Sequence, residues 1–192
     1  MERLVQHGAD KVVLVQNAAF ANFLVEPQAH TMHYLVNTYH PEIILGAATT
    51  TGRTVMPYLA MLLHTGLTAD CTGLEIEAET GNLLQIRPAI GGNIMATIKT
   101  PDTRPQMSTV RPKSILVQVA DPMHPGEITR VDVPVEVMQS RMRFEKATVE
   151  SSGNAVLEEA NIVVSGGSGL MGPEGLAAVD GLANALGAAI GS

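Results

Sequence analysis

The amino-acid sequence predicts an α/β protein with a Rossmann-like parallel sheet, an antiparallel meander, and the opening strand, turn and helix of a second domain. Three observations support this fold class. Short β-branched runs alternate with helical patterns up to residue 64, turn residues recur closely between residues 74 and 111, and a glycine-rich turn joins a strand to a helix after residue 160. Alternation of strand and helix is typical of parallel sheets.

The first strand and helix lie in the N-terminal forty residues. Lys11–Gln16 (KVVLVQ) is an apolar, β-branched run of the kind that forms a buried strand. A helix is predicted to start at or just after Pro27, with Leu35, Val36 and Tyr39 on one face. Pro41 is expected to end this helix.

The second strand and helix follow directly. Glu42–Ala47 (EIILGA) predicts a second buried strand, and TTTGR forms the turn after it. A helix is predicted from about Thr54 to His64, with Pro57 in its first turn, where proline is tolerated. These continuous apolar strands indicate a parallel sheet that is covered on both faces.

The middle of the chain has a different pattern, in which turn residues recur every eight to twelve positions or so. Four short strands are predicted as an antiparallel meander. They are Leu74–Ala78, Asn82–Arg87, Asn93–Lys99 and Met107–Arg111. The linkers are Glu79–Gly81, Pro88–Gly92 and Thr100–Pro105, and the proline-containing residues 120–141 are expected to form a partly extended crossing segment.

The domain boundary is predicted near Glu150, because Ser151–Asn154 has the composition of a linker. The first domain is therefore assigned to residues 1–150 and the second to residues 151–192. The second begins with a strand at Asn161–Ser165, a glycine-rich turn, and a helix from Pro173 to about Leu186. This order opens a nucleotide-binding strand–helix–strand unit, and we expect the sequence to end before the next strand.

Composition excludes several classes of protein. The net charge of −7, without a basic run, argues against nucleic acid as a partner. The single cysteine, Cys71, fits a reducing cytoplasm and is more simply a small buried residue than a reactive thiol. No apolar run approaches the length of a membrane span, and the N-terminus lacks the pattern of a secretory signal. A soluble, cytoplasmic protein is expected.

The glycine-rich turn after the last predicted strand is the first candidate site. It comprises Ser165, Gly166, Gly167, Ser168 and Gly169. Backbone N–H groups in such a turn bind phosphate with the help of the helix dipole. The spacing differs from the GxGxxG pattern, so a tight strand-to-helix connection explains the turn equally well.

Two arginines, Arg87 and Arg111, form the second candidate site. Each precedes a proline, which favours an extended backbone, and together they bound the meander. A fixed guanidinium in such a position suits an anionic, planar cofactor, whereas a surface ion pair is the ordinary alternative. In TTTGR, the threonine hydroxyls and Arg53 are groups that can contact a phosphate or a partner subunit. At least one of the threonines is expected to cap the following helix.

Motifs for other chemistry are missing from the sequence. His30, His33 and His40 lie on or next to one helix, but no carboxylate or cysteine joins them at a metal-ligand spacing. The sequence has no GxSxG, HExxH or P-loop motif. We therefore expect no hydrolytic or acyl-transfer enzyme and no metal centre.

Several motifs in series carry a resemblance to a known family. GAATTTGRTVMPYLAMLLHTGLTADCTGL resembles the stretch GATTxGRDLAPRLAARLxTGLTADCT of electron transfer flavoprotein alpha subunits. LLQIRPAIGGNIMATI and RPQMSTVRP continue the match in order, and ANIVVSGGSGLMGPEG is similar to the family's VVSGGRGLGSPEN. The forms LTADC and RPQM-TVRP are most similar to the branch with carnitine-linked, nitrogen-fixation-linked and electron-bifurcating members.

The resemblance implies an electron-carrier subunit rather than a catalyst with its own substrate. It implies a beta subunit as partner, FAD as cofactor in the second domain, and flavin dehydrogenases as electron donors or acceptors. By the same resemblance, Arg87 lies near a flavin held by the partner, and the turn Ser165–Gly169 opens the FAD site.

Departures from the family pattern qualify this expectation. Ser168 stands where the family has an arginine that contacts the flavin ring. Without the arginine, a charge-assisted hydrogen bond to the flavin, of about 1.5–3 kcal/mol, is lost. The family's N-terminal strand and helix and its later FAD motifs (SRxxVDxG-like) are expected to lie outside this sequence. We therefore expect no FAD binding by this chain alone. Two alternatives stay open, a cofactor-free partner-binding module or broken-gene product, and an adenine-nucleotide domain that uses the TTTGR turn.

Overall fold

The computed structural model describes residues 1–89, 93–148, 157, 160–170 and 172–191. The chain divides into two compact units, Met1–Glu145 and Lys146–Ser192, and each is considered by itself. The first unit contains every strand and helix up to residue 145 and the larger core. The predicted linker Ser151–Asn154 lies outside the described residues.

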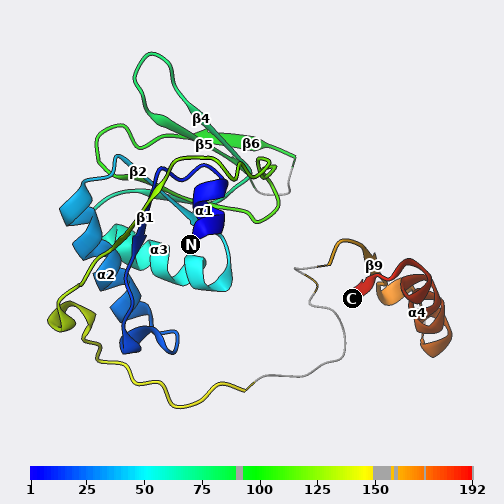
Figure 1. Cartoon of the computed structure of the whole chain (residues 1–192). Helices are drawn as coiled ribbons and strands as arrows, with labels where there is room; N and C mark the ends of the chain where they lie inside the picture. Colours follow the sequence, from blue (N-terminus) through cyan, green and yellow to red (C-terminus); the bar gives the residue numbers. More distant parts are fainter. Residues whose placement is uncertain (90–92, 149–156, 158–159, 171, 192) are drawn as a thin grey trace. The chain divides into compact units, whose positions relative to one another are not determined.

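A parallel sheet forms the centre of the first unit, as predicted. Its strand order is β2 (Ile43–Ala47), β7 (Gln106–Val110) and β3 (Leu67–Cys71), and all three run in the same direction. β1 (Lys11–Leu14) pairs in parallel with β8 (Glu127–Arg130) in a separate two-stranded sheet. Figure 1 shows α3 on one side of the central sheet and the meander on the other.

The helices of this unit are α1 (Glu2–Gln6), α2 (Val25–Tyr39) and α3 (Thr50–Leu62), with short 3-10 turns at Ala18–Phe20 and Val135–Met138. The core lies between α3 and β7, where Met56, Leu59, Ala60 and Met107 are buried together. α2 ends where His40 takes the left-handed conformation with φ 47°. Its end before Pro41 agrees with the sequence, although its start precedes Pro27 by two residues.

The prediction for the start of α3 was wrong. The helix begins at Thr50 rather than near Thr54, so Pro57 lies in its interior and not in its first turn. The reason is the cap, since the Thr49 hydroxyl oxygen accepts a hydrogen bond from the N–H of Gly52 at 3.2 Å. One threonine of the TTTGR turn therefore caps the helix, as expected.

Three of the four predicted meander strands pair as expected, and the fourth does not. β4 (Gly73–Ile76), β5 (Leu83–Pro88) and β6 (Met95–Ile98) form the antiparallel sheet. The segment Met107–Arg111 instead belongs to β7, the central parallel strand, because Gln106 to Thr109 are buried and bonded within the core. The predicted linker Pro88–Gly92 lies partly outside the described residues.

Two further predictions for this unit need correction. Glu42–Ala47 was expected to be a buried strand, yet Leu45 of β2 is 52% exposed because β2 lies at the edge of its sheet. Strands β3 and β8 were not predicted, and β8 lies within the expected crossing segment 120–141. In both, polar residues interrupt the apolar pattern that identifies strands in a sequence.

The second unit contains β9 (Val163–Ser165), a 3-10 turn at Ser168–Leu170, α4 (Pro173–Leu186) and β10 (Ala189–Gly191). Pro173 occupies the first turn of α4, as predicted. The expectation that the sequence ends before the next strand was wrong, since β10 pairs in parallel with β9. Gly187, with φ 60°, ends α4 and allows the chain to return to the sheet within two residues.

A buried carboxylate fastens the end of the first unit to α2. Glu26 accepts hydrogen bonds from the Ser140 hydroxyl at 2.8 Å and from the Arg141 backbone N–H at 2.7 Å, and the Arg141 guanidinium lies 3.1 Å away. These bonds, led by the one from Ser140, lower the pKa of Glu26 from 4.5 to about 2.

This pKa shift predicts acid sensitivity. Because the folded-state pKa lies below the unfolded value, the contribution of Glu26 to stability is complete above pH 4.5 and is lost as the pH falls toward about 2. We expect the melting temperature of the wild type to fall more steeply over this interval than that of Glu26→Gln, which cannot titrate there. Parallel curves for the two proteins would contradict the assignment.

Candidate functional site

The carboxyl edge of the central sheet brings several polar side chains together. β2, β7 and β3 are parallel, so Ala47, Val110 and Cys71 end at the same edge. α3 starts directly after β2, with Gly52 in its first turn. A Cβ on Gly52 would lie 1.8 Å from the carbonyl oxygen of Ala47, so only glycine fits this close turn. Ligands of open α/β sheets commonly bind at such an edge.

Asp70 is the centre of this cluster. It interrupts the regular pairing of β3 with β7 and takes the left-handed conformation with φ 61°. Its backbone N–H donates a hydrogen bond to the Thr109 hydroxyl oxygen at 2.9 Å, which holds the irregular backbone in place. Aspartate tolerates this conformation better than most residues.

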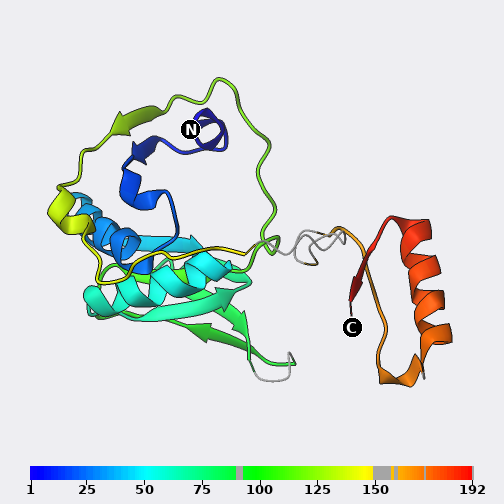
Figure 2. The same ribbon diagram turned by 90° about the horizontal axis from the view of Figure 1, so that it is seen from below.

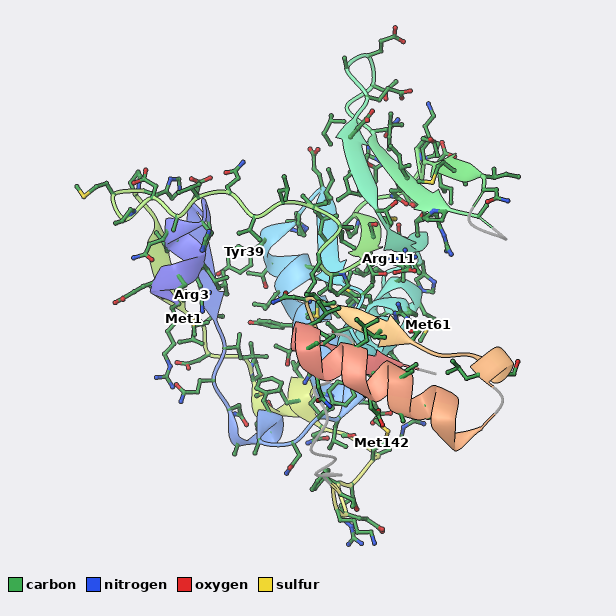
Figure 3. The ribbon with its side chains drawn as sticks, turned by 90° about the vertical axis from the view of Figure 1, so that its right-hand side faces the viewer. Met1, Arg3, Tyr39, Met61, Arg111 and Met142 are labelled. Carbon is green, nitrogen blue, oxygen red and sulfur yellow. The ribbon has the colours of Figure 1, made fainter. Side chains whose placement is uncertain are left out.

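Arg111, labelled in Figure 3, makes the strongest contact with Asp70. Its Nε lies 3.2 Å from Oδ1 and its Nη2 lies 2.7 Å from Oδ2, a two-pronged ion pair. This contact is the main reason that the pKa of Asp70 is lowered and that of Arg111 is raised. The surface ion pair that the sequence left open for Arg111 is therefore present.

Two further arginines approach the same carboxylate. Arg53 donates from Nε to the Ala48 carbonyl at 3.0 Å, and its Nη2 lies 3.5 Å from Asp70. Arg87 donates from Nε to the Pro88 carbonyl at 3.4 Å, and its charge also lowers the pKa of Asp70. Within the described ranges, no carboxylate lies within 4.0 Å of Arg87.

Of the two predicted arginines, Arg111 contacts Asp70 directly, beside Arg53, whereas Arg87 acts on this carboxylate only through its charge. Arg53 and Arg111 lie within 4.0 Å of Asp70, and the charge of Arg87 also acts on this carboxylate, so three positive charges meet one negative charge in a chain of net charge −7. Such a cluster can hold an anionic group without itself supplying a nucleophile or a general base. The sequence analysis did not identify Asp70. Its position in the motif LTADC, between two threonine-rich turns, was the feature that could have indicated it.

The turn Ser165–Gly169 lies in the second unit, after β9. A Cβ on Gly166 would lie 2.2 Å from the end of the Leu170 side chain, which would have to move, whereas Gly167 and Gly169 have open space around them. The 3-10 turn at Ser168–Leu170, which contains Gly169, separates Gly166 and Gly167 from the start of α4 at Pro173.

The cysteine and two of the histidines considered in the sequence make local contacts within the fold. Cys71 is buried and accepts a hydrogen bond from the Ser108 hydroxyl at 3.0 Å. His30 packs edge-on against Tyr58, and His33 lies 3.3 Å from the Asn37 amide. In the part of the chain that the structure describes, no three His, Cys, Asp or Glu side chains gather as metal ligands do. Among the same residues, no helix is both long and apolar enough to cross a bilayer.

Comparison with known proteins agrees with the fold and with the resemblance in sequence motifs. The electron transfer flavoprotein domain family matches residues 2–136. The chain belongs to this family.

Curated relatives extend the match to almost the whole chain. The chain is 44% identical to an electron transfer flavoprotein subunit alpha of Thermoanaerobacterium thermosaccharolyticum, over 98% of this chain and 57% of the relative. It is 38% identical to the FixB protein of Bradyrhizobium diazoefficiens, over 96% of this chain and 50% of the relative. It is 35% identical to the LctC subunit of an NAD- and ferredoxin-dependent lactate dehydrogenase of Acetobacterium woodii, over 98% and 45%. The chain thus spans about half the length of these relatives.

Proposed function

We propose that this chain acts as an alpha subunit, or part of one, in an electron carrier that pairs with a beta subunit. In this role it passes electrons between flavin dehydrogenases and an acceptor, and has no substrate of its own. The observation that carries the proposal is the family match over residues 2–136, together with relatives named alpha subunit and FixB. We place the protein in the cytoplasm.

The arginine cluster supports the choice of a site on the first unit. We propose that Arg87 and Arg111 lie near the flavin of the partner subunit, where positive charge stabilises an anionic flavin. Arg87 is the better candidate, because Arg111 is already engaged by Asp70 through both carboxylate oxygens. The role of Asp70 is then to fix the orientation of Arg111 and to hold Arg53 beside it.

The second unit is proposed as the opening of an FAD-binding domain, with Ser165, Gly166, Gly167, Ser168 and Gly169 facing the phosphates. The residues present fit this cofactor only in part. Ser168 supplies no guanidinium for the flavin ring, and Gly167 and Gly169 are not required by packing. We therefore propose FAD as the cofactor of the complex and not of this chain alone.

The proposal is tested by a visible absorption spectrum, recorded after FAD is added in excess and the protein is desalted. We expect this chain to be colourless alone, to co-purify with a beta subunit, and to retain flavin only in that complex. Ser168→Arg is expected to stay colourless, because one guanidinium does not replace a pocket. Stoichiometric flavin on that variant would contradict this, and failure to form a complex with a beta subunit would overturn the proposed function.

A further inference from the structure

The carboxyl end of β7 holds the polar cluster around Asp70 together. Three consecutive residues there make one contact each. The Thr109 hydroxyl oxygen accepts a hydrogen bond from the Asp70 backbone N–H at 2.9 Å. The Val110 carbonyl oxygen accepts one from the Ala48 N–H at 2.8 Å, and Arg111 forms the two-pronged ion pair with Asp70. The chain then leaves the sheet, as the open arc between β7 and β8 in Figure 2 shows.

β3 carries one more residue than β7 at the position of Asp70. The pairs on either side are Thr68 with Ser108 and Cys71 with Val110. An extra residue of this kind bends a strand and turns a side chain in a new direction. Asp70 takes the left-handed conformation with φ 61°, and its N–H bonds to the side chain of Thr109. The direction of the Asp70 carboxylate therefore depends on this hydroxyl.

The burial of Thr109 makes its hydroxyl notable. The residue is 1% exposed, and a hydroxyl so deep in a protein is unfavourable unless it is hydrogen-bonded. Valine would fill almost the same space without a polar group, so packing alone gives no reason for threonine. The bond to the Asp70 N–H supplies that reason.

The two arginines that contact Asp70 have separate attachments to the sheet. The backbone N–H of Arg111 donates to the Cys71 carbonyl at 2.8 Å. Nε of Arg53 donates at 3.0 Å to the carbonyl of Ala48, the residue whose N–H is bound by β7. Both guanidinium groups then reach the same carboxylate. A displacement of Asp70 would therefore release both of them at once.

We propose that Thr109 is a positioning residue for the arginine cluster, acting through Asp70 without touching a flavin itself. By fixing the Asp70 backbone, it keeps the carboxylate where Arg53 and Arg111 both reach it. Charged groups that are held in place before binding lose less freedom when a ligand arrives. The consequence for flavin rests on the proposed function, whereas the role of Thr109 in placing Asp70 does not.

The first test uses the whole chain without a partner. Hydrogen bonding to Arg111 is the main reason that the pKa of Asp70 is lowered, so titration of its carboxyl carbon by nuclear magnetic resonance reports on the ion pair. We expect this pKa to rise in Thr109→Val and to stay low in Thr109→Ser, which keeps the hydroxyl. Arg111→Ala gives the value for a broken pair. An unchanged pKa in Thr109→Val, or an equal rise in Thr109→Ser, would overturn the proposal.

Ser108→Ala is the matched control for this titration. Ser108 is also buried in β7, but its hydroxyl donates to Cys71, so its loss should leave the pKa of Asp70 unchanged. A rise as large as that in Thr109→Val would mean that any loosening of β7 has the same effect, and the proposal would fall. If Thr109→Val does not fold, hydrogen exchange of the wild type decides. The Asp70 N–H should be protected, and free exchange would contradict the bond to Thr109.

The second test measures flavin binding by the complex with a beta subunit. We expect Thr109→Val to weaken flavin binding by about tenfold, and Thr109→Ser to retain most of the wild-type affinity. Equal affinity in all three proteins would overturn the role of Thr109 in flavin binding. Failure to pair with a beta subunit would count against the proposed function, and the titration would still decide whether Thr109 positions Asp70.

Discussion

Leu59→Ala is expected to lower the free energy of unfolding by about 2–5 kcal/mol. Leu59 is fully buried in the middle of α3, among Met56, Ala60 and Met107. Removing its side chain leaves a cavity between the helix and the central strand. Urea unfolding, followed by circular dichroism, measures the change.

A neighbouring methionine provides the control for this prediction. Met61 lies in the same helix but is 57% exposed, so Met61→Ala should change the stability by no more than about 0.5 kcal/mol. If Leu59→Ala cost less than about 1 kcal/mol, then α3 would not pack on β7 as described. If both variants were equally destabilised, the burial of Leu59 would not be the cause of the effect.

Gly52→Ala is expected to be the second most damaging change, and to act at the candidate site as well as on stability. The new Cβ would lie 1.8 Å from the Ala47 carbonyl oxygen, which is backbone and cannot move aside as a side chain can. Strain of about 1–3 kcal/mol adds to loss of the Thr49 cap, about 1 kcal/mol. We expect a destabilisation of roughly 2–4 kcal/mol in total.

The control for this prediction is a glycine without close neighbours. Gly181 lies inside α4, and a Cβ there meets nothing within 4 Å, so Gly181→Ala should be neutral or stabilising by up to about 1 kcal/mol. Gly52→Ala should also displace Arg53, which is held by the Ala48 carbonyl in the same turn. A variant as stable as the wild type would show that the turn after β2 is looser than described.

Much of the candidate site could be predicted from the sequence, because arginine-proline pairs and a threonine-rich turn are local patterns. Arg87 and Arg111 were identified as a pair; Arg111 contacts Asp70, whereas Arg87 acts on this carboxylate only through its charge. The identity of that carboxylate could not be predicted, because Asp70 is on a strand that the sequence did not reveal and reaches the arginines through an irregular backbone. Long-range pairing is invisible to a local pattern.

The difference between local patterns and long-range pairing also explains which strands could be placed from the sequence. Local patterns in the sequence were sufficient to identify the family, the parallel class of fold and the positions of β1, β2, α2 and α4, because each depends on residues that are close together in the chain. The position of Gln106–Val110 at the centre of the parallel sheet, and not in the meander, depends on contacts between distant segments and is visible only in the folded chain. Its polar side chains look suited to a surface, yet Gln106 is satisfied in the core by Leu83, Asn82 and Thr100. Such a strand becomes favourable only when distant hydrogen-bond partners are already in place.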